Sequence, residues 1–218
     1  MELVQGEGGF IVPPKRFVQA VSAFCKEHGI VFVADEIQTG FGRTGKLFAS
    51  EHFDIEPDLV TVSKSLAAGL PLSGVVGRKE ILNAADPGEL GGTYSGSPVA
   101  CAAALAVIEI VEEENLLEKA EKVGSEIESK LEELARKHEY VGEIRRLGAM
   151  VAVEIVDNRK NKAPNKAKTD EIIKNANENG LLLLSAGIKG NVIRFLTPLV
   201  ITEDELSKGF AILENAFN

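Results

Sequence analysis

The sequence predicts an α/β fold, in which part of a large parallel-rich sheet is followed by a smaller carboxyl-terminal α/β domain. Two unbroken apolar runs, at residues 30–34 and 59–63, are typical of parallel strands that helices cover on both faces. Segments with helical spacing of apolar side chains alternate with these runs. A long, charged amphipathic segment at residues 115–138 precedes a change in composition. We therefore expect one domain over residues 1–114 and a second over residues 115–218.

The elements of the first domain follow from apolar spacing and from residues that start or stop helices. Pro13 and Pro14 suit the start of a helix, and Gly29 suits its end. Pro98 suits the first turn of a helix that follows a Gly- and Ser-rich loop. The expected elements, in order, are a helix over 15–28, strands over 30–34, 59–63 and 73–77, and a helix over 99–111.

The second domain is predicted as a small sheet with helices around it. Its first helix, over 115–138, carries a regular apolar stripe. The stripe consists of Leu117, Ala120, Val123, Ile127, Leu131 and Leu134. The remaining expected elements are strands over 144–156 broken at Gly148, a helix over 169–179, strands over 181–184 and 191–196, and a final helix from Glu203.

Composition excludes several classes of protein. Of the 218 residues, 44% are hydrophobic, which is enough for a buried core and argues against a disordered chain. With 24 Lys and Arg against 33 Asp and Glu, the net charge of −9 offers no basic surface for nucleic acid or an anionic membrane. No signal-peptide pattern or membrane-length apolar run occurs, so we expect a soluble cytoplasmic protein. Neither the two cysteines, Cys25 and Cys101, nor the three histidines have the spacing of a metal site.

Asp35 and Lys64 are the principal candidates for chemistry, because each directly follows a predicted strand. Ligands of open α/β sheets bind outside the carboxyl ends of the strands, so we expect both side chains at one edge. A lysine beside apolar strands loses solvation, which makes its neutral amine available to form a Schiff base with an aldehyde. An aspartate nearby can pair with a pyridinium nitrogen, and the two together suit pyridoxal phosphate. The alternative is that both are ordinary polar strand ends in contact with solvent.

Two glycine-rich loops are candidates for phosphate binding. Residues 40–45 match G-x-G-x-x-G, but no helical stripe follows directly, so we interpret them as a structured loop rather than a dinucleotide site. Residues 91–98 combine Gly91 and Gly92 with three hydroxyl side chains ahead of a helix start, which suits an anion. An ordinary capped helix is an equal alternative for this second loop.

Glu7 and Arg194 are unusual for their positions. Glu7 lies in a Gly-rich turn, and Arg194 interrupts the apolar strand predicted over 191–196. An arginine inside a strand usually reaches a carboxylate or solvent, so a structural salt bridge is the simplest interpretation from these residues alone.

Four motifs resemble those of the class III pyridoxal-phosphate-dependent aminotransferases, enzymes of fold type I. They are Val4-Gln5-Gly6-Glu7-Gly8-Gly9, Ala34-Asp35-Glu36-Ile37-Gln38-Thr39-Gly40, Ser63-Lys64-Ser65 and Gly92-Thr93-Tyr94. The motifs keep the order and spacing of the family, and the resemblance runs from about residue 2 to the carboxyl terminus. Within the family, residues 181–187 and 190–194 most resemble the bacterial 4-aminobutyrate aminotransferases.

The resemblance implies cofactor roles for five residues. Lys64 would form the internal aldimine with pyridoxal 5′-phosphate and then shuttle a proton, while Asp35 would pair with the pyridine nitrogen. Ile37 would pack under the ring, and Gln38 would hydrogen-bond the 3′-oxygen. Thr93 would bind the cofactor phosphate of a partner subunit, which implies a homodimer.

The resemblance also implies substrate roles for Glu7 and Arg194. Arg194 would hold the α-carboxylate of glutamate or 2-oxoglutarate, and Glu7 would neutralise it when an ω-amino acid enters. The implied reaction moves an amino group from an ω-amino acid, 4-aminobutyrate, to 2-oxoglutarate. Because roughly the first half of the family's enzymes precedes Val4, the chain resembles their carboxyl-terminal half only.

Two other functions fit the same residues. One is a truncated, catalytically inert fragment that folds and self-associates. The other is a racemase or epimerase that uses the same cofactor on the same scaffold, and it would convert an L-amino acid without any 2-oxo acid acceptor.

Overall fold

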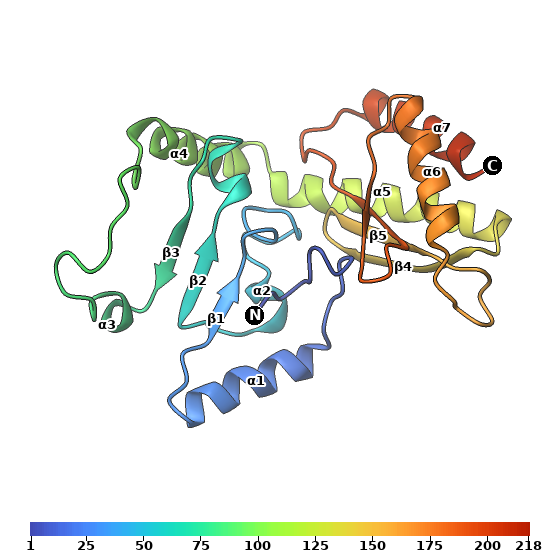
Figure 1. The fold of residues 1–218 in the computed structure, drawn as a ribbon. Helices are drawn as coiled ribbons and strands as arrows, with labels where there is room; N and C mark the ends of the chain where they lie inside the picture. The colour runs from blue at the N-terminus through green and yellow to red at the C-terminus, as the bar shows by residue number, and fades with distance from the viewer. The chain divides into compact units, whose positions relative to one another are not determined.

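The computed structural model describes residues 1–218 and divides the chain into two compact units. The first unit comprises Met1–Val4 and Pro13–Leu117, and the second comprises Gln5–Val12 and Glu118–Asn218. Each unit has its own hydrophobic core and its own sheet (Figure 1). The segment Gln5–Val12 thus belongs to the second unit although both flanking segments belong to the first, which the hydropathy pattern did not predict.

The first unit contains a three-stranded sheet in the order β1-β2-β3. β1 (Val33–Asp35) pairs in parallel with β2 (Leu59–Val62), and β3 (Gly74–Gly77) pairs antiparallel to β2. All three strands were predicted, but the predicted start of the first was wrong. Ile30 and Val31 precede β1 and are 48% and 46% exposed.

The burial of this sheet also differs from the prediction of strands covered on both faces. β1 and β2 are mostly half-buried, and β3 is largely exposed. Val75 and Val76 of β3 have exposed fractions of 51% and 60%. The apolar runs therefore identify the strands correctly, while this chain by itself leaves part of their surface uncovered.

Two long helices of the first unit match their predictions within two residues. They are α1 (Lys15–Glu27), which buries Val18 and Cys25 in the core, and α4 (Pro98–Glu113), whose first residue is the predicted proline. Three helical turns of four residues each were not predicted, because so short a segment cannot show an amphipathic stripe. They are α2 (Ser50–Phe53), η1 (Lys64–Ala67) and α3 (Lys79–Leu82).

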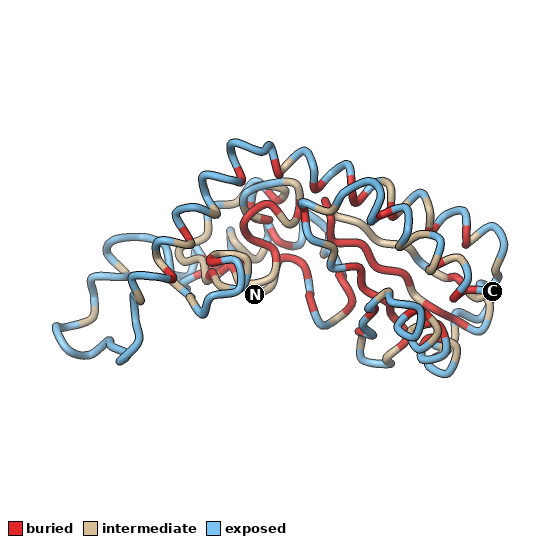
Figure 2. Tube along the Cα trace, turned by 90° about the horizontal axis from the view of Figure 1, so that it is seen from above, coloured by how far each residue is buried: buried red, intermediate tan, exposed pale blue.

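The second unit contains a four-stranded antiparallel sheet in the order β4-β5-β7-β6. Figure 2 shows buried residues running through the strands of this sheet. The strands are β4 (Val141–Leu147), β5 (Met150–Ile155), β6 (Leu184–Ala186) and β7 (Val192–Phe195). The strand predicted over 181–184 was misplaced, since β6 begins where that prediction ended.

Three helices pack against this second sheet. They are α5 (Leu116–Lys137), α6 (Lys166–Glu178) and α7 (Glu203–Phe217). Their buried side chains, such as Ile127, Ile172 and Leu213, form one cluster with buried strand residues. The predicted stripe of α5 is confirmed except at its start, where Leu116 is buried and Leu117 is half-buried.

None of the helices combines the length and apolar character that crossing a bilayer requires. Cys25 and Cys101 are both free thiols.

Two helical glycines of the second unit give a matched test of its packing. A Cβ on Gly124 in α5 would come within 1.8 Å of the carbonyl oxygen of Gly148, whereas a Cβ on Gly209 in α7 would meet its nearest atom at 3.7 Å. We expect Gly124→Ala to lower the free energy of unfolding by about 1–3 kcal/mol through overpacking. Gly209→Ala should raise it by about 0.5–1 kcal/mol, because alanine favours a helix.

Urea denaturation of the two variants and the wild type measures both effects. Equal stability of Gly124→Ala and the wild type would contradict the close approach of α5 to the turn between β4 and β5.

Candidate active site

Asp35, the last residue of β1, carries a carboxylate held in one orientation by its neighbours. Its Oδ1 accepts hydrogen bonds from the backbone N–H of Ile37 at 3.1 Å and from the hydroxyl of Thr61 at 3.2 Å. Asp35 and Thr61 are register partners in the parallel pair of β1 and β2. No group of the chain donates to Oδ2, so one carboxylate oxygen is fixed and the other is open.

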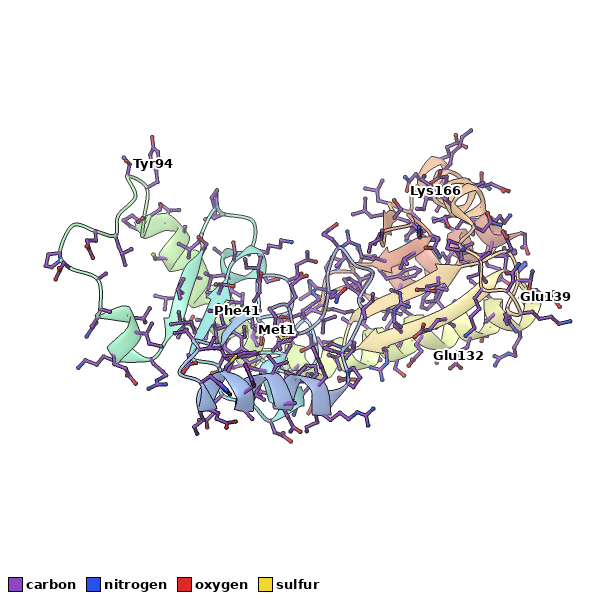
Figure 3. All side chains as sticks on the ribbon, turned by 60° about the horizontal axis from the view of Figure 1, so that its bottom comes forward. Met1, Phe41, Tyr94, Glu132, Glu139 and Lys166 are labelled. Atoms are coloured by element: carbon purple, nitrogen blue, oxygen red, sulfur yellow. The ribbon has the colours of Figure 1, made fainter.

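The backbone of Asp35 is also fixed on its other side. Its N–H donates to the carbonyl oxygen of Met1 at 2.9 Å, and Glu2 forms a parallel bridge to it. Met1 is labelled in Figure 3. Asp35 therefore lies between two parallel neighbours, which restricts where its carboxylate can point.

Lys64 follows β2 by two residues and begins η1. Its φ of 46° lies in the left-handed region, which costs a non-glycine residue roughly 1 kcal/mol or more. The preceding Ser63 is extended, and its hydroxyl donates to the carbonyl oxygen of Leu72 at 3.0 Å. This geometry turns the chain sharply at Lys64.

The Lys64 side chain is exposed and makes no hydrogen bond or ion pair within the chain. The prediction of an amine desolvated by the apolar strands is therefore wrong for this chain alone, because β2 ends before the lysine. The amine is unpartnered, which leaves it available for covalent chemistry.

Ile37 and Gln38 lie in the turn that follows Asp35, and both are half-buried. The glycine-rich residues 40–45 continue this run of turns, and the next helix, α2, begins only at Ser50. The interpretation as a structured loop is confirmed. Burial lowers the pKa of the Arg43 guanidinium from its ordinary value, which agrees with a well-packed loop.

Thr93 lies in an exposed loop ahead of α4, as predicted. The turn is closed by a hydrogen bond from the Ser95 N–H to the Gly92 carbonyl oxygen at 3.0 Å. The neighbouring Tyr94 is 91% exposed and points away from the ribbon in Figure 3. No hydrogen bond joins Thr93 to Asp35 or Lys64 within the chain, and the prediction places Thr93 at the cofactor of a partner subunit instead.

Glu7 and Arg194 form the predicted ion pair, and both belong to the second unit. The Arg194 Nη1 donates to Glu7 Oε1 at 2.9 Å, and Nη2 donates to Oε2 at 3.2 Å. The side chain of Arg194 is 5% exposed, whereas that of Glu7 is 77% exposed. The pair therefore joins a buried guanidinium to a carboxylate that is largely exposed.

Further contacts hold the Arg194 guanidinium in place. Nη1 also donates to the Gly6 carbonyl oxygen at 3.0 Å, and the guanidinium carbon lies 5.7 Å from the centre of the Phe10 ring. The buried Nε has no hydrogen-bond partner in the chain. An unsatisfied buried donor costs roughly 1–3 kcal/mol, so the guanidinium is held here at some cost in stability.

A second arginine, Arg145 of β4, holds the backbone of the same segment. Arg145 and Arg194 both pair in register with Ala152 of β5, so the two arginines share one face of the sheet with a small residue between them. Arg145 donates from Nε and Nη2 to the Gly9 carbonyl oxygen at 3.2 and 2.9 Å. The segment Gln5–Val12 is thus fixed over Ala152 by guanidinium groups on either side.

Thr61 and Arg145 are site residues that the sequence analysis missed. Thr61 is a polar residue within an apolar strand run, and that interruption was the available signal. Arg145 and Arg146 are adjacent and therefore lie on opposite faces of their strand. The sequence alone does not tell which of the two faces carries the segment Gln5–Val12.

Arg145 and Arg146 allow a matched test of the hold on segment Gln5–Val12. Arg146 pairs with Glu121 and Glu128 of α5 and does not touch the segment. We expect Arg145→Lys to speed amide hydrogen exchange of Phe10 by about tenfold, because a lysine cannot reproduce the forked bond to Gly9.

Arg146→Lys should leave exchange of Phe10 within about twofold of the wild type. Hydrogen exchange followed at single amides by NMR measures both variants, and similar exchange of Phe10 in the two would contradict the role assigned to Arg145.

Comparisons with known proteins extend over the whole chain. A family model described as aminotransferase class-III matches residues 1–217. A probable 4-aminobutyrate aminotransferase of Bacillus subtilis is 66% identical over 214 residues, covering 98% of this chain and 49% of that protein. A 5-aminovalerate aminotransferase of Pseudomonas aeruginosa is 50% identical over 218 residues, covering 100% of this chain and 51% of that protein.

A solved structure agrees with these matches. The amine transaminase of an uncultivated Pseudomonas species, in its pyridoxal-phosphate-bound form, superposes with a TM-score of 0.89 at 37% identity, covering 99% of this chain and 50% of that one. The chain therefore spans about half the length of the relatives it matches. The predicted fold type I architecture is confirmed, and the chain belongs to the class III aminotransferases.

Proposed function

We propose that this chain is part of a pyridoxal-phosphate-dependent aminotransferase that moves an amino group from an ω-amino acid to 2-oxoglutarate. In this proposal residues 1–114 belong to a cofactor-binding domain and residues 115–218 form the small domain. Two features carry the proposal. The Asp35 carboxylate has one oxygen fixed by hydrogen bonds and one open, and the Lys64 amine has no partner. The names of the relatives, which act on 4-aminobutyrate or 5-aminovalerate, support 4-aminobutyrate or a close homologue as donor.

The residues of the first unit fit the cofactor. Pyridoxal phosphate supplies, when bound, an aldehyde that bonds to amines and a protonated ring that withdraws electrons. The open Oδ2 of Asp35 would accept a hydrogen bond from the ring nitrogen and keep the proton there. Lys64 Nζ would hold the cofactor through its amine and would move a proton at the substrate Cα. Ile37 would pack against the ring, and Gln38 would donate to its 3′-oxygen.

The residues of the second unit fit a substrate that carries a carboxylate in one half-reaction and not in the other. When a 2-oxo acid or α-amino acid enters, Glu7 moves into solvent and Arg194 binds the α-carboxylate with the same forked geometry. When an ω-amino acid without that carboxylate enters, Glu7 returns and neutralises the buried guanidinium. The exposure of Glu7 and the burial of Arg194 support this alternation.

The exposed loop before α4 supports a homodimer. Thr93 is exposed, and apolar surface beside it is uncovered at Tyr94 and at Val99, which are 91% and 69% exposed. We propose that a second subunit covers this surface and that Thr93 binds the phosphate of the partner's cofactor.

Borohydride reduction tests the assignment of Lys64. Pyridoxal phosphate added to the 218-residue chain, followed by reduction and peptide mapping, should label Lys64, because its amine is unpartnered and lies next to the Asp35 edge of the sheet. Lys64→Ala should lose the label, while Lys46→Ala, which removes another exposed lysine of the same unit, should keep it. Labelling of Lys46 as strong as that of Lys64 would contradict the proposal.

Binding of 2-oxoglutarate tests the roles of Glu7 and Arg194. Glu7→Gln should tighten binding by about tenfold, because the guanidinium is then not neutralised, and Arg194→Lys should weaken it by about tenfold. Glu143→Gln is the control, since Glu143 pairs with Arg145 in the same unit and is exposed. Calorimetric titration measures the affinity of all three variants. Unchanged affinity in Glu7→Gln would contradict the proposal that Glu7 and the substrate carboxylate alternate at Arg194.

A further inference from the structure

Glu36, the residue after Asp35, carries a carboxylate that is completely buried. Three donors surround it, and all are uncharged. Oε1 accepts from the Ser50 N–H at 2.8 Å, and Oε2 accepts from the Ala49 N–H at 2.9 Å and from the Thr39 hydroxyl. Burying a carboxylate without a cation costs desolvation free energy, which its hydrogen bonds partly offset. Because the acceptor is charged, these bonds are stronger than neutral ones and hold the three donor groups in place.

The backbone of Glu36 is fixed as well. Its N–H donates to the Thr61 carbonyl oxygen at 3.0 Å, and its carbonyl oxygen accepts from the Gly40 N–H at 2.9 Å. Glu36 therefore joins three parts of the first unit, namely β2, the turn over 37–40 and the start of α2. A Cβ on Gly40 would lie 2.9 Å from the Glu36 carbonyl oxygen, so the turn is closed too tightly for a side chain there.

The turn that Glu36 closes contains one of the two donors that orient Asp35. The Ile37 N–H reaches Asp35 Oδ1 only while residues 36–40 keep this conformation. The same turn carries Gln38, the residue proposed to bind the 3′-oxygen. Because Glu36 is inaccessible, it cannot touch a ligand, and any effect on binding must pass through Asp35 and the turn.

We propose that Glu36 is a positioning residue, whose buried carboxylate fixes the Ile37 N–H and so aims the open oxygen of Asp35 at a pyridinium nitrogen. The inference rests on the proposed function for the identity of the ligand. Its structural part, the hold of Glu36 on the turn, is independent of any ligand.

The first arm of the test uses hydrogen exchange in the chain without cofactor. Glu36→Gln puts an amide N–H₂ opposite at least one of the N–H groups of Ala49 and Ser50, so the turn loses a hydrogen bond. We expect exchange of the Ile37 amide to rise about tenfold, with β2 amides unchanged. Glu51→Gln is the control, because Glu51 also accepts a backbone N–H, that of Phe48 at 2.9 Å, but is exposed.

The second arm measures the affinity for pyridoxal phosphate by absorbance titration, in a double-mutant cycle with Asp35→Asn. If Glu36 acts through Asp35, Glu36→Gln weakens binding about tenfold in the wild type and less than about twofold in the Asp35→Asn background. Equal losses in both backgrounds, or unchanged affinity together with faster Ile37 exchange, overturn the proposal.

Thr39→Val provides a second variant if Glu36→Gln does not fold. It keeps the shape of Thr39 and removes only its hydroxyl, so it should raise Ile37 exchange and weaken binding in the same sense, each by about threefold. A wild-type chain that binds no pyridoxal phosphate counts against the proposed function instead. In that case hydrogen exchange alone tests the role of Glu36. Ile37 exchange within twofold of the wild type in both variants overturns that role.

Discussion

The parallel pairing of β1 with β2 is the constraint on which the candidate active site depends. Because Asp35 and Thr61 are register partners, the threonine hydroxyl reaches the carboxylate across the ladder. Lys64 follows Thr61 by three residues and lies just beyond the end of β2. A shift of one residue in this register would turn Thr61 to the other face and remove one of the two bonds that orient Asp35. The orientation of the Asp35 carboxylate therefore depends on Thr61, which lies 26 residues further along the chain.

In the second unit the corresponding constraint is the row of residues across β4, β5 and β7. Arg145 and Arg194 flank Ala152 on one face, and the small side chain between them leaves room for the backbone of Gln5–Val12. The two guanidinium groups bind carbonyl oxygens three residues apart in this segment, those of Gly9 and Gly6. Glu7 is thus presented to Arg194 by an antiparallel sheet that begins more than 130 residues after it, as the separation of Gly9 and Arg145 shows.

Local patterns predicted most of the fold and only part of the site. The long helices α1 and α5 were found because each shows several turns of apolar spacing, and α4 because Pro98 follows a Gly- and Ser-rich loop. The start of β1 and the start of β6 were wrong, since hydrophobicity marks a strand but its pairing partner decides which residues join the ladder. Thr61 and Arg145 were missed for the same reason. Their roles come from pairing across strands, which spacing along one strand does not reveal.

Three of the residues to which we assign roles conflict with local rules. Lys64 has a left-handed backbone conformation, Arg194 is buried with an unsatisfied Nε, and Glu36 is buried without a cation. Each conflict costs free energy, because a left-handed conformation is cheaper for glycine, and burial is cheaper for an aliphatic side chain than for a charged group. The surrounding structure holds all three nevertheless, through the Ser63 bond, the Glu7 pair and the turn over 37–40. Conflicts of this kind concentrate where a fold is shaped for a ligand rather than for stability alone.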